Sequence, residues 1–395
     1  MEPQVRIGLA NLTQMAFAGI DLQPLRSHLI SQCVQSREPD GMLMDLSIID
    51  QLQGNRELGL EWQAQALERQ RIYSTNRRFD KQAKLLVFAE PGHMGANTPI
   101  EFLLQGAEFE ILTYYPDMQS DVPQILPPHD VAFCAAPADS SQSARFYDHV
   151  RRLTARSGKR VLNLPTVPVN LDRDSLGAVF PYVDGLRFPS TVRVIRAEAS
   201  RHDDFPCVIR PVGSHAGAGL AKLDTVQGLQ EYLATRAEQE FFISEYIDYA
   251  DPDGSFRKQR VILVDGRPFP CHMAVSDRWD LWYLNAGMES CADKRRQEAA
   301  FMDGFDAGFA RRHARALDAL AAGIGLDYFG IDCAEDRDGK LVVFEADNAL
   351  IVHDMDSETV FPYKRRHMRR LFTAFEEMLK RSAHLAPPRM PALAG

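Results

Sequence analysis

The chain has 395 residues, of which 45% are hydrophobic and 25% are charged, and its formal net charge is −9. A chain of this length exceeds one simple core, so we expect two or three domains. The ordinary charged fraction excludes wholesale disorder, and the acidic balance disfavours nucleic acid and anionic membranes as partners.

The cysteines and the apolar segments bear on the cellular compartment. Six cysteines are scattered along the sequence, with no CxxC pair and no zinc-like spacing, so reduced thiols are expected. No apolar run is long enough to span a bilayer, and the N-terminus lacks the basic start and apolar stretch of a secretory signal. We therefore expect cytoplasmic residence.

Residues 1–80 are expected to form a helical N-terminal segment. Between Leu43 and about Tyr73 the apolar spacing predicts two helices joined near Gly54, and the stretch from Gly54 to Ala66 resembles a tetratricopeptide unit. A single such unit cannot form a solenoid, which needs about three repeats. We therefore favour a helical cap packed on the main body over a partner-binding repeat.

Residues 81–190 are expected to form an α/β domain. Residues 85–88 are a continuous apolar run flanked by turn residues, which is typical of a buried parallel strand. Strands and helices then alternate, with predicted strands at 108–115, 130–135 and 160–164 and predicted helices at 100–105 and 146–155. This alternation implies a sheet with parallel strands.

The loop at 90–99 follows the first of these strands and precedes a helix. Its glycines and the helix N-terminus could bind an anion, but the GxGxxG pattern is missing, so a tight turn is the simpler interpretation. Contact with a substrate is a further expectation, because ligands favour the carboxyl ends of parallel strands.

Residues 191–385 are expected to form a second α/β region, followed by a loose tail at 386–395. In its first motif a strand delivers Arg210 to a turn that contains Gly217 and Gly219, and no Gly-Lys-Ser/Thr of a Walker loop follows. Glycines let backbone N–H groups approach negative oxygens without interference from Cβ. The motif predicts a flexible phosphate cover, with an ordinary turn as the alternative.

Two further motifs lie on strands. A β-rich stretch runs from Phe241 to Asp248. A strand that leaves the sheet at its end can offer backbone groups to an adenine edge while an acid reads the ribose hydroxyls. An ordinary edge strand is the alternative. The sequence around Asp265 and Gly266 predicts a hairpin with Arg260 near its start, either as a functional cation or as a surface arginine.

The last motif predicts a metal site. An Asp-Gly turn at Asp338 joins two strands, so Asp332 is expected opposite the region of Glu345, and Asp347 shares the face of Glu345. Carboxylates on apolar strands repel one another and resist burial, and a hard divalent cation bound by oxygen ligands resolves both problems. We prefer a metal site to a solvated acidic edge.

Taken in order, these motifs resemble the ATP-grasp superfamily of the carboxylate–amine ligase type, over roughly residues 84–379. The resemblance implies a parallel α/β pre-ATP-grasp domain and a two-subdomain ATP-grasp fold. The expected fold class is therefore α/β and α+β, with the helical N-terminal segment in front. The resemblance also implies ATP between the two subdomains and Mg²⁺, with Mn²⁺ as an alternative, at the carboxylates.

The same resemblance assigns roles to single residues. Arg260 matches the family arginine that steadies the transferring phosphoryl group or a tetrahedral intermediate. Arg173 and Arg210 stand where many relatives carry lysines, and arginine keeps the charge while adding bidentate donors. The residues implied in nucleotide binding are Arg173, Arg210, Ser214, Gly217, Gly219, Glu245, Tyr246, Ile247 and Phe344.

The metal motif departs from the family pattern. Relatives usually show Glu-x-Asn, whereas this chain has aspartate at the third position, and aspartate is a competent magnesium ligand. The implied metal ligands are Asp332, Glu345 and Asp347, and Asn348 is the alternative third ligand.

The family chemistry implies the reaction. A substrate carboxylate attacks the γ-phosphate of ATP, and an amine displaces phosphate from the resulting acyl phosphate. The expected partners are small-molecule or peptide carboxylates and amines, such as amino acids, and a homodimer is a family-level expectation. Arg278 is the candidate that holds a substrate carboxylate, and His353 is the candidate that accepts a proton from the amine.

Two alternatives stay open. One is a catalytically silent, nucleotide-binding regulatory protein that uses the N-terminal helices for partners. The other is an ATP-grasp kinase, or a ligase that uses a thiol or hydroxyl acceptor. The retained carboxylates favour an enzyme.

Overall fold

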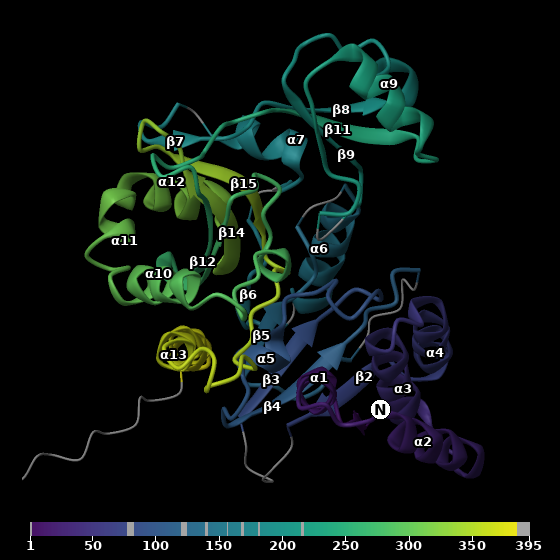
Figure 1. Cartoon of the computed structure of the whole chain (residues 1–395). Helices are drawn as coiled ribbons and strands as arrows, with labels where there is room; N and C mark the ends of the chain where they lie inside the picture. Colours follow the sequence, from purple (N-terminus) through teal and green to yellow (C-terminus); the bar gives the residue numbers. More distant parts are fainter. Residues whose placement is uncertain are drawn as a thin grey trace, which may run out of the picture.

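The computed structural model of the chain describes residues 2–76, 83–119, 125–138, 141–155, 157–166, 170–180, 182–214 and 217–384 (Figure 1). The expected tail at 386–395 lies outside these residues, as do positions 215 and 216 of the glycine-rich turn. Within the described residues the strands form three sheets, and the expected mixture of α/β and α+β architecture is confirmed. No helix in this part of the chain has the length and apolar character needed to cross a membrane.

The first sheet has the strand order β1-β2-β4-β3-β5-β6. Its strands are β1 Gln4–Val5, β2 Ile72–Thr75, β3 Ala83–Phe88, β4 Phe109–Tyr114, β5 Val131–Cys134 and β6 Val161–Leu162. The helices between these strands include α5 Ile100–Leu103 and α6 Ser141–Thr154. β3 pairs in parallel with β4 and β5, and β5 pairs in parallel with β6, so the predicted parallel strands are confirmed.

The N-terminal segment contributes β1 and β2 to this sheet. β1 is parallel to β2, and β2 is antiparallel to β4, so this segment and the following α/β region share one sheet. The prediction that the second helix reaches Tyr73 is wrong, because helix α4 ends at Arg69 and Gln70 is already extended. The carboxamide oxygen of Gln70 accepts hydrogen bonds from the backbone N–H groups of Arg71 and Ile72, which starts the strand.

The N-terminal helices pack on one side of the sheet. They are α1 Leu9–Phe17, α2 Gln23–Gln35, α3 Asp40–Leu52 and α4 Arg56–Arg69. α3 and α4 form the predicted helical hairpin, and Gly59 permits their close approach, since a Cβ there would lie 2.7 Å from the carbonyl oxygen of Ser47. Their apolar side chains share a buried cluster with Tyr73, Ala89 and Tyr115, which is the packing expected of a cap.

The second sheet is antiparallel, with the order β10-β9-β11-β8. Its elements are β8 Thr191–Ile195, α8 Arg196–Ala199, β9 Cys207–Pro211, β10 Ala221–Leu223, α9 Val226–Ala234 and β11 Glu240–Glu245. Ile209, Leu229 and Phe241 belong to a buried cluster within this unit. In Figure 1 the unit stands at the top of the molecule, away from the first sheet.

The third sheet has the order β13-β12-β14-β15-β7. Its strands are β7 Leu186–Arg187, β12 Phe256–Val264, β13 Arg267–Ser276, β14 Tyr328–Glu335 and β15 Leu341–Asp347. The predicted hairpins β12–β13 and β14–β15 are confirmed. Asp265 and Gly266 have φ values of 50° and 73°, as a tight hairpin turn with two left-handed residues requires.

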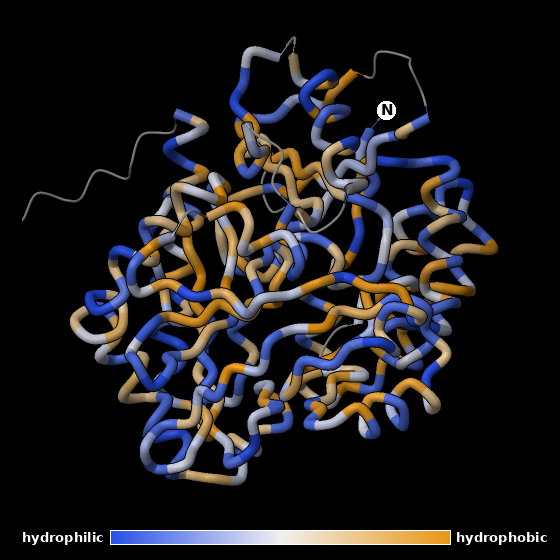
Figure 2. Tube along the Cα trace, turned by 90° about the horizontal axis from the view of Figure 1, so that it is seen from above, coloured by the Kyte–Doolittle hydropathy of each residue, from blue (hydrophilic) through white to orange (hydrophobic). Residues whose placement is uncertain are grey.

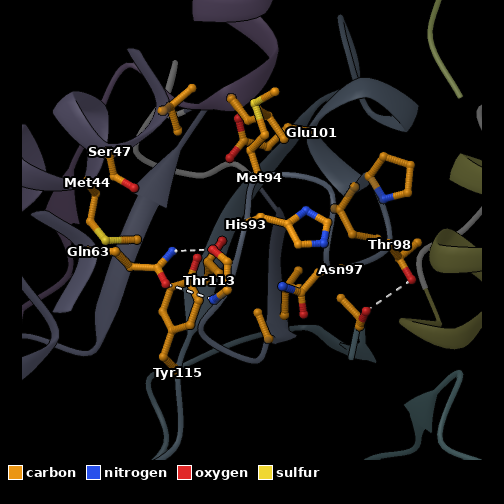
Figure 3. Close-up of a pocket in the computed structure, with 18 of the residues that line it drawn as sticks. Met44, Ser47, Gln63, His93, Met94, Asn97, Thr98, Glu101, Thr113 and Tyr115 are labelled. Atoms are coloured by element: carbon orange, nitrogen blue, oxygen red, sulfur yellow. Dashed lines mark hydrogen bonds between the residues drawn. The ribbon is translucent and has the colours of Figure 1, made fainter. Parts of the chain in front are cut away.

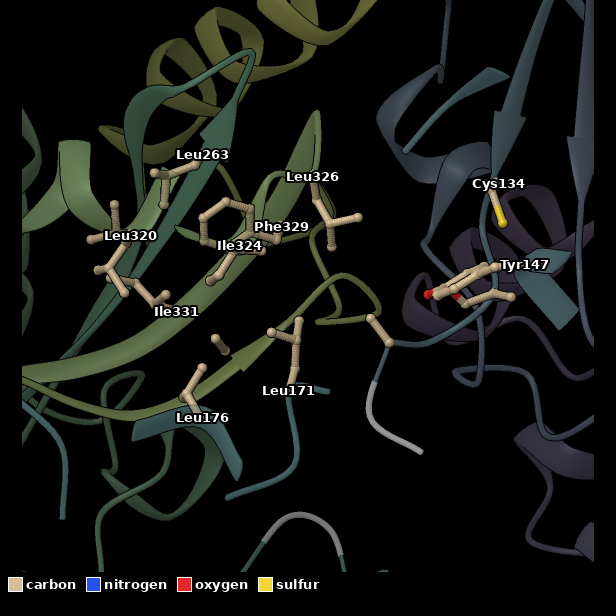
Figure 4. Packing of buried hydrophobic residues seen from close by; sticks show 14 of the residues in the cluster. Cys134, Tyr147, Leu171, Leu176, Leu263, Leu320, Ile324, Leu326, Phe329 and Ile331 are labelled. Carbon is tan, nitrogen blue, oxygen red and sulfur yellow. The ribbon is translucent and has the colours of Figure 1, made fainter. Parts of the chain in front are cut away.

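Helices cover both faces of the third sheet. The helices and helical turns of this part are α7 Arg173–Leu176, η1 Gly177–Val179, η2 Tyr283–Asn285, α10 Ala292–Asp303, α11 Phe309–Arg312, α12 Ala314–Ile324 and α13 Lys364–Ser382. On one face, Leu320 and Ile324 of α12 pack with Phe329 and Ile331 of β14 (Figure 4). Neighbouring residues of a strand point to opposite faces, so Tyr328 faces the other side.

Helix α13 lies between the third sheet and the first sheet. The ring of Phe375 lies 5.3 Å from that of Tyr328 in β14 and 5.6 Å from that of Phe133 in β5. Figure 2 shows hydrophobic stretches running through the body and hydrophilic segments along much of its outline. A common core thus holds the two sheets together.

Asn348 adds a polar link between these sheets. It follows β15 and is fully buried, and its side-chain oxygen accepts a hydrogen bond from the Ala138 backbone N–H at 3.0 Å. Its NH₂ group donates to the Ala136 carbonyl oxygen at 2.8 Å and to the Thr98 hydroxyl at 3.2 Å. The end of β15 is therefore tied to the loops that follow β3 and β5.

Asn348→Ala is expected to lower the free energy of unfolding by about 1–3 kcal/mol, because it leaves the Ala138 backbone N–H buried without a partner and removes one of the two donors to the Ala136 carbonyl. Urea denaturation measures this loss. Asn285→Ala is the matched control, since Asn285 also makes two backbone hydrogen bonds but is exposed. Its expected cost is about 0.5 kcal/mol. Equal losses in the two variants would contradict the polar link.

Candidate active site

One row of polar side chains crosses the third sheet. His272 of β13 pairs with Arg260 of β12, Arg260 pairs with Asp332 of β14, and Asp332 pairs with Glu345 of β15. Directly opposed residues on neighbouring strands point to the same face of a sheet. The structure therefore brings the predicted residues Arg260, Asp332 and Glu345 together on one face.

Two β-bulges set this row. The β12–β13 register shifts after Arg260, and the β14–β15 register shifts after Asp332. An unbroken hairpin would place Asp332 opposite Phe344, whereas the bulge places it opposite Glu345. Phe344 is left unpaired in the ladder, and its ring packs 5.2 Å from that of Tyr249.

Asp332 is the most strongly paired acid of the row. Arg260 donates from Nε and Nη2 to its two carboxylate oxygens at 2.7 and 3.2 Å, and the Lys258 ammonium lies 2.9 Å from Oδ2. The side chain is buried, which opposes ionisation, but the charges of Arg260 and Lys258 outweigh burial and hold the pKa of Asp332 far below its usual value. Asp332 is therefore a carboxylate at neutral pH.

Two arginines from outside the sheet influence the charge of Glu345, and one of them, Arg173, contacts it. Arg173, the first residue of α7, donates from Nη2 to Glu345 Oε1 at 2.5 Å. Burial opposes the charge of Glu345, but the charge of Arg173 outweighs it and keeps the pKa of Glu345 below its usual value. Burial and the charge of Arg173 lower the pKa of Arg210 to about 10. A buried arginine whose charge is disfavoured by a nearby arginine marks a place for an anion.

The glycine turn lies directly after Arg210. Arg210 Nε donates to the Ser214 hydroxyl at 3.0 Å. Gly217 and Gly219 have φ values of 73° and 68°, and a Cβ on Gly219 would lie 2.6 Å from Pro211. The sequence thus needs glycine at both positions to fold the turn back beside its strand.

The expected adenine hinge follows β11. The Glu245 carboxylate is exposed and accepts a hydrogen bond from Arg187 Nη2 at 2.5 Å. The ammonium of Lys222 lies 4.2 Å from the centre of the Tyr246 ring, and Ile247 is buried. A nucleotide ribose at this position would have to share Glu245 with Arg187.

The three predicted metal ligands lie on adjacent strands. Asp347 pairs with Gly330, and its Oδ1 accepts a hydrogen bond from the Ala349 backbone N–H at 2.7 Å. Over the described part of the chain, no group of three or more His, Cys, Asp or Glu side chains is close enough to hold a metal ion. The donor set fits Mg²⁺ in chemistry, since Asp332 and Glu345 are ionised oxygen donors, but the structure does not gather the ligands into a preformed cage.

The two candidate substrate residues, Arg278 and His353, lie outside the row of charges and contact other residues. Arg278 is exposed and forms a two-pronged ion pair with Asp280, at 2.9 and 2.6 Å. The His353 ring packs 5.4 Å from that of Phe17, and its Nδ1 accepts a hydrogen bond from the Met355 backbone N–H. Burial lowers the pKa of His353, so its ring is neutral.

Sequence reasoning missed Lys258 and His272. Lys258 lies two residues before Arg260 and therefore shares its face, a signal that strand alternation supplies. Counting back from the Asp265–Gly266 turn would place Cys271 opposite Arg260, and only the bulge brings His272 there. Burial and the nearby charge of Arg260 hold the pKa of His272 well below its usual value.

Comparison with known proteins gives likenesses of structure only. The chain matches no protein-family profile and no curated protein. An ATP-grasp RimK domain protein from Sphaerobacter thermophilus is 14% identical and has a TM-score of 0.42, with 75% of this chain and 99% of that chain covered. The chain is similar to ATP-grasp proteins.

Two further similar structures are ligases. D-alanine–D-alanine ligase from Bacillus anthracis, complexed with ATP, is 14% identical with a TM-score of 0.43, over 77% of this chain and 99% of that chain. The ATP-grasp ligase PsnB, complexed with precursor peptide PsnA2 and AMPPNP, is 13% identical with a TM-score of 0.39, over 76% and 100%. These are similarities of fold.

Arg260 and Asp332 are expected to contribute to the free energy of unfolding in a strongly coupled way. Asp332→Asn should lower the free energy of unfolding by about 3–5 kcal/mol, because Arg260 is then buried without its counter-ion. The double variant Arg260→Gln, Asp332→Asn should lose less than the sum of the single variants, with an interaction energy of about 1–3 kcal/mol in a double-mutant cycle.

The exposed pair Arg337–Asp248, at 2.7 Å, is the control for this cycle. The same exchanges there should give an interaction energy of about 0.5 kcal/mol, because water screens surface ion pairs. Similar interaction energies for the two pairs would contradict the buried unit.

Proposed function

We propose that the chain is an ATP-dependent ligase that joins a carboxylate to an amine and releases ADP and phosphate. The observation that carries this proposal is the contact of Arg173 with Glu345. Arg210 lies within electrostatic range of both, and the ionised Asp332 stands directly opposite Glu345. A triphosphate supplies the negative oxygens that two neighbouring guanidinium groups bind best. The carboxylates next to them supply oxygen donors for the divalent ion that ATP carries.

We assign Mg²⁺, or Mn²⁺ as an alternative, to Asp332, Glu345 and Asp347. Each carboxylate oxygen has two lone pairs, so an oxygen that accepts from arginine can still bind a metal. Asn348 is set aside, because its amide already makes three hydrogen bonds within the core. A metal ion held by these residues would neutralise charge on the transferring phosphoryl group.

The protein side chains are proposed to act by positioning and electrostatics. In the first step a substrate carboxylate oxygen bonds to the γ-phosphorus, the bond to the bridging oxygen breaks, and ADP leaves. In the second step the amine nitrogen bonds to the acyl carbon, phosphate leaves, and the amine proton passes to a base. Arg260 would steady the charge that develops in both steps, and no side chain needs to act as a nucleophile.

The remaining residues complete the proposed site. Arg173, Arg210 and the turn with Ser214, Gly217 and Gly219 would hold the phosphates. Glu245, Tyr246, Ile247 and Phe344 would hold adenosine, since the ring of Phe344 packs on Tyr249 just beyond the hinge. Arg278 and His353 are proposed to act on the acceptor side. A Cβ added to Gly217 would lie 3.9 Å from the Trp282 ring, so the glycine turn comes close to the segment that contains Trp282.

Trapping with hydroxylamine tests this function. The protein is incubated with ATP, Mg²⁺ and a library of carboxylic acids, including amino acids and short peptides, and hydroxylamine captures any acyl phosphate. We expect hydroxamate and ADP in equal amounts. Glu345→Gln should lower both by about a hundredfold, because it removes a charged ligand from the transition state.

Asp338→Asn is the control, since Asp338 lies exposed in the turn of the same hairpin, and it should keep full activity. Binding of ATP without turnover across the library would favour the silent regulatory alternative instead. ADP formation with a phosphorylated product and no hydroxamate would indicate a kinase.

A further inference from the structure

A pocket separate from the row of charges lies between the N-terminal helices and the loop that follows β3 (Figure 3). It has a volume of about 80 Å³. In Figure 3 Ser47 and Gln63 of the helical hairpin line one side, and His93 and Asn97 of the loop lie opposite them. The ends of β3 and β4 form the floor.

The helical hairpin fixes the loop wall of this pocket. Gln63 exchanges two hydrogen bonds with the backbone of Gly92, at 2.8 and 3.0 Å. The Gln51 side-chain oxygen accepts a hydrogen bond from the Met94 N–H at 2.8 Å. Side chains of two helices thus hold the backbone of the loop in place and define the shape of the pocket.

A buried pair of opposite charges lines the pocket. Arg6 Nη2 donates to Glu101 Oε1 at 2.7 Å, and the two side chains are only 6% and 11% exposed. Arg6 Nε is buried and has no hydrogen-bond partner among the described residues. A buried guanidinium N–H without an acceptor is disfavoured, so it indicates that a ligand supplies the acceptor.

A glycine in the N-terminal segment leaves space for the Arg6–Glu101 pair. Gly8 has a φ of 89°, and a Cβ there would lie 2.5 Å from Glu101 Oε2. The same Glu101 oxygen accepts a hydrogen bond from the Ala10 backbone N–H at 3.1 Å. Glycine thus lets the N-terminal segment pass close enough to orient the carboxylate.

We propose that this pocket binds a small α-amino acid as its zwitterion, with its carboxylate on Arg6 and its ammonium on Glu101. The carboxylate and the ammonium group of such a ligand are both attached to the α-carbon and therefore lie close together. This spacing matches Arg6 and Glu101, which lie side by side in the pocket. Apolar side chains of Leu9, Met44 and Ile48 also line the pocket and would cover the ligand side chain. An apolar cavity of about 150 Å³ holds benzene, so a pocket of half that volume selects small side chains.

This inference does not rest on the proposed ligase activity. The pocket is built from residues outside the row of charges, and its contact with that region is the hydrogen bond from Asn348 to Thr98, which lines the pocket. Binding of an amino acid to the pocket can therefore be tested without nucleotide. Failure of amino-acid binding and failure of the ligase activity would be recognised in separate experiments.

Isothermal titration of the full chain with glycine, L-alanine and L-serine, in the absence of ATP, tests the proposal. At least one of them should bind with a dissociation constant of about 1 mM or tighter. Acetate and methylamine each satisfy only one charge and should bind about tenfold more weakly or worse. Binding of none of the amino acids, or equal binding of acetate, would overturn the proposal.

Matched variants locate the ligand. Arg6→Lys keeps a positive charge beside Glu101 but lacks the Nε donor, and should weaken binding about tenfold or more. Arg26→Lys is the same exchange at an arginine that pairs with Asp50 and does not line the pocket, and should leave affinity unchanged. Glu345→Gln should also leave it unchanged.

Thermal unfolding of each variant checks that it is folded before titration. Glu101→Gln is the second pocket variant, because its amide oxygen can still accept from Ala10 while the charge is lost. It should likewise bind about tenfold more weakly. Wild-type affinity in a folded Arg6→Lys or Glu101→Gln protein would contradict the assignment.

Discussion

The antiparallel register of β12, β14 and β15 is the constraint on which the candidate site depends. Side chains alternate along a strand, so a shift of one residue would turn an acid away from its partner. The regular β12–β14 register places Asp332 opposite Arg260, and the bulge between β14 and β15 places it opposite Glu345. Apolar residues on either side of these positions stay in the core, which allows charged groups on an otherwise hydrophobic hairpin.

Charge balance follows from that register. Asp332 is neutralised by two cations of its own sheet, while Glu345 receives Arg173 from the segment between the first and third sheets. Arg210 adds positive charge from the second sheet, and burial together with the charge of Arg173 lowers its pKa to about 10. The region thus combines fixed anions with surplus cations, the arrangement that a metal–polyphosphate ligand complements. Asn348 secures the geometry by joining the end of β15 to the first sheet.

The sequence predicts the parts of this structure that local patterns determine. Continuous apolar runs located β3 to β6, and the turns at Asp265 and Asp338 located the two hairpins and the opposition of acids. The pairing of β1 with β2 was missed because the whole helical cap separates them. His272 was missed because a bulge has no signature in the alternation of residues. The pocket of the cap was missed as well, since Gln63 meets the loop only after the chain has folded.

The magnesium dependence of nucleotide binding tests whether the carboxylates of β14 and β15 hold a metal–nucleotide complex. Titration with the ATP analogue AMPPNP is carried out with and without Mg²⁺, on the wild-type protein and on Glu345→Gln. We expect Mg²⁺ to tighten binding to the wild-type protein about tenfold or more, and we expect this gain to disappear in Glu345→Gln. Equal affinity with and without Mg²⁺, or a full gain in Glu345→Gln, would contradict this assignment.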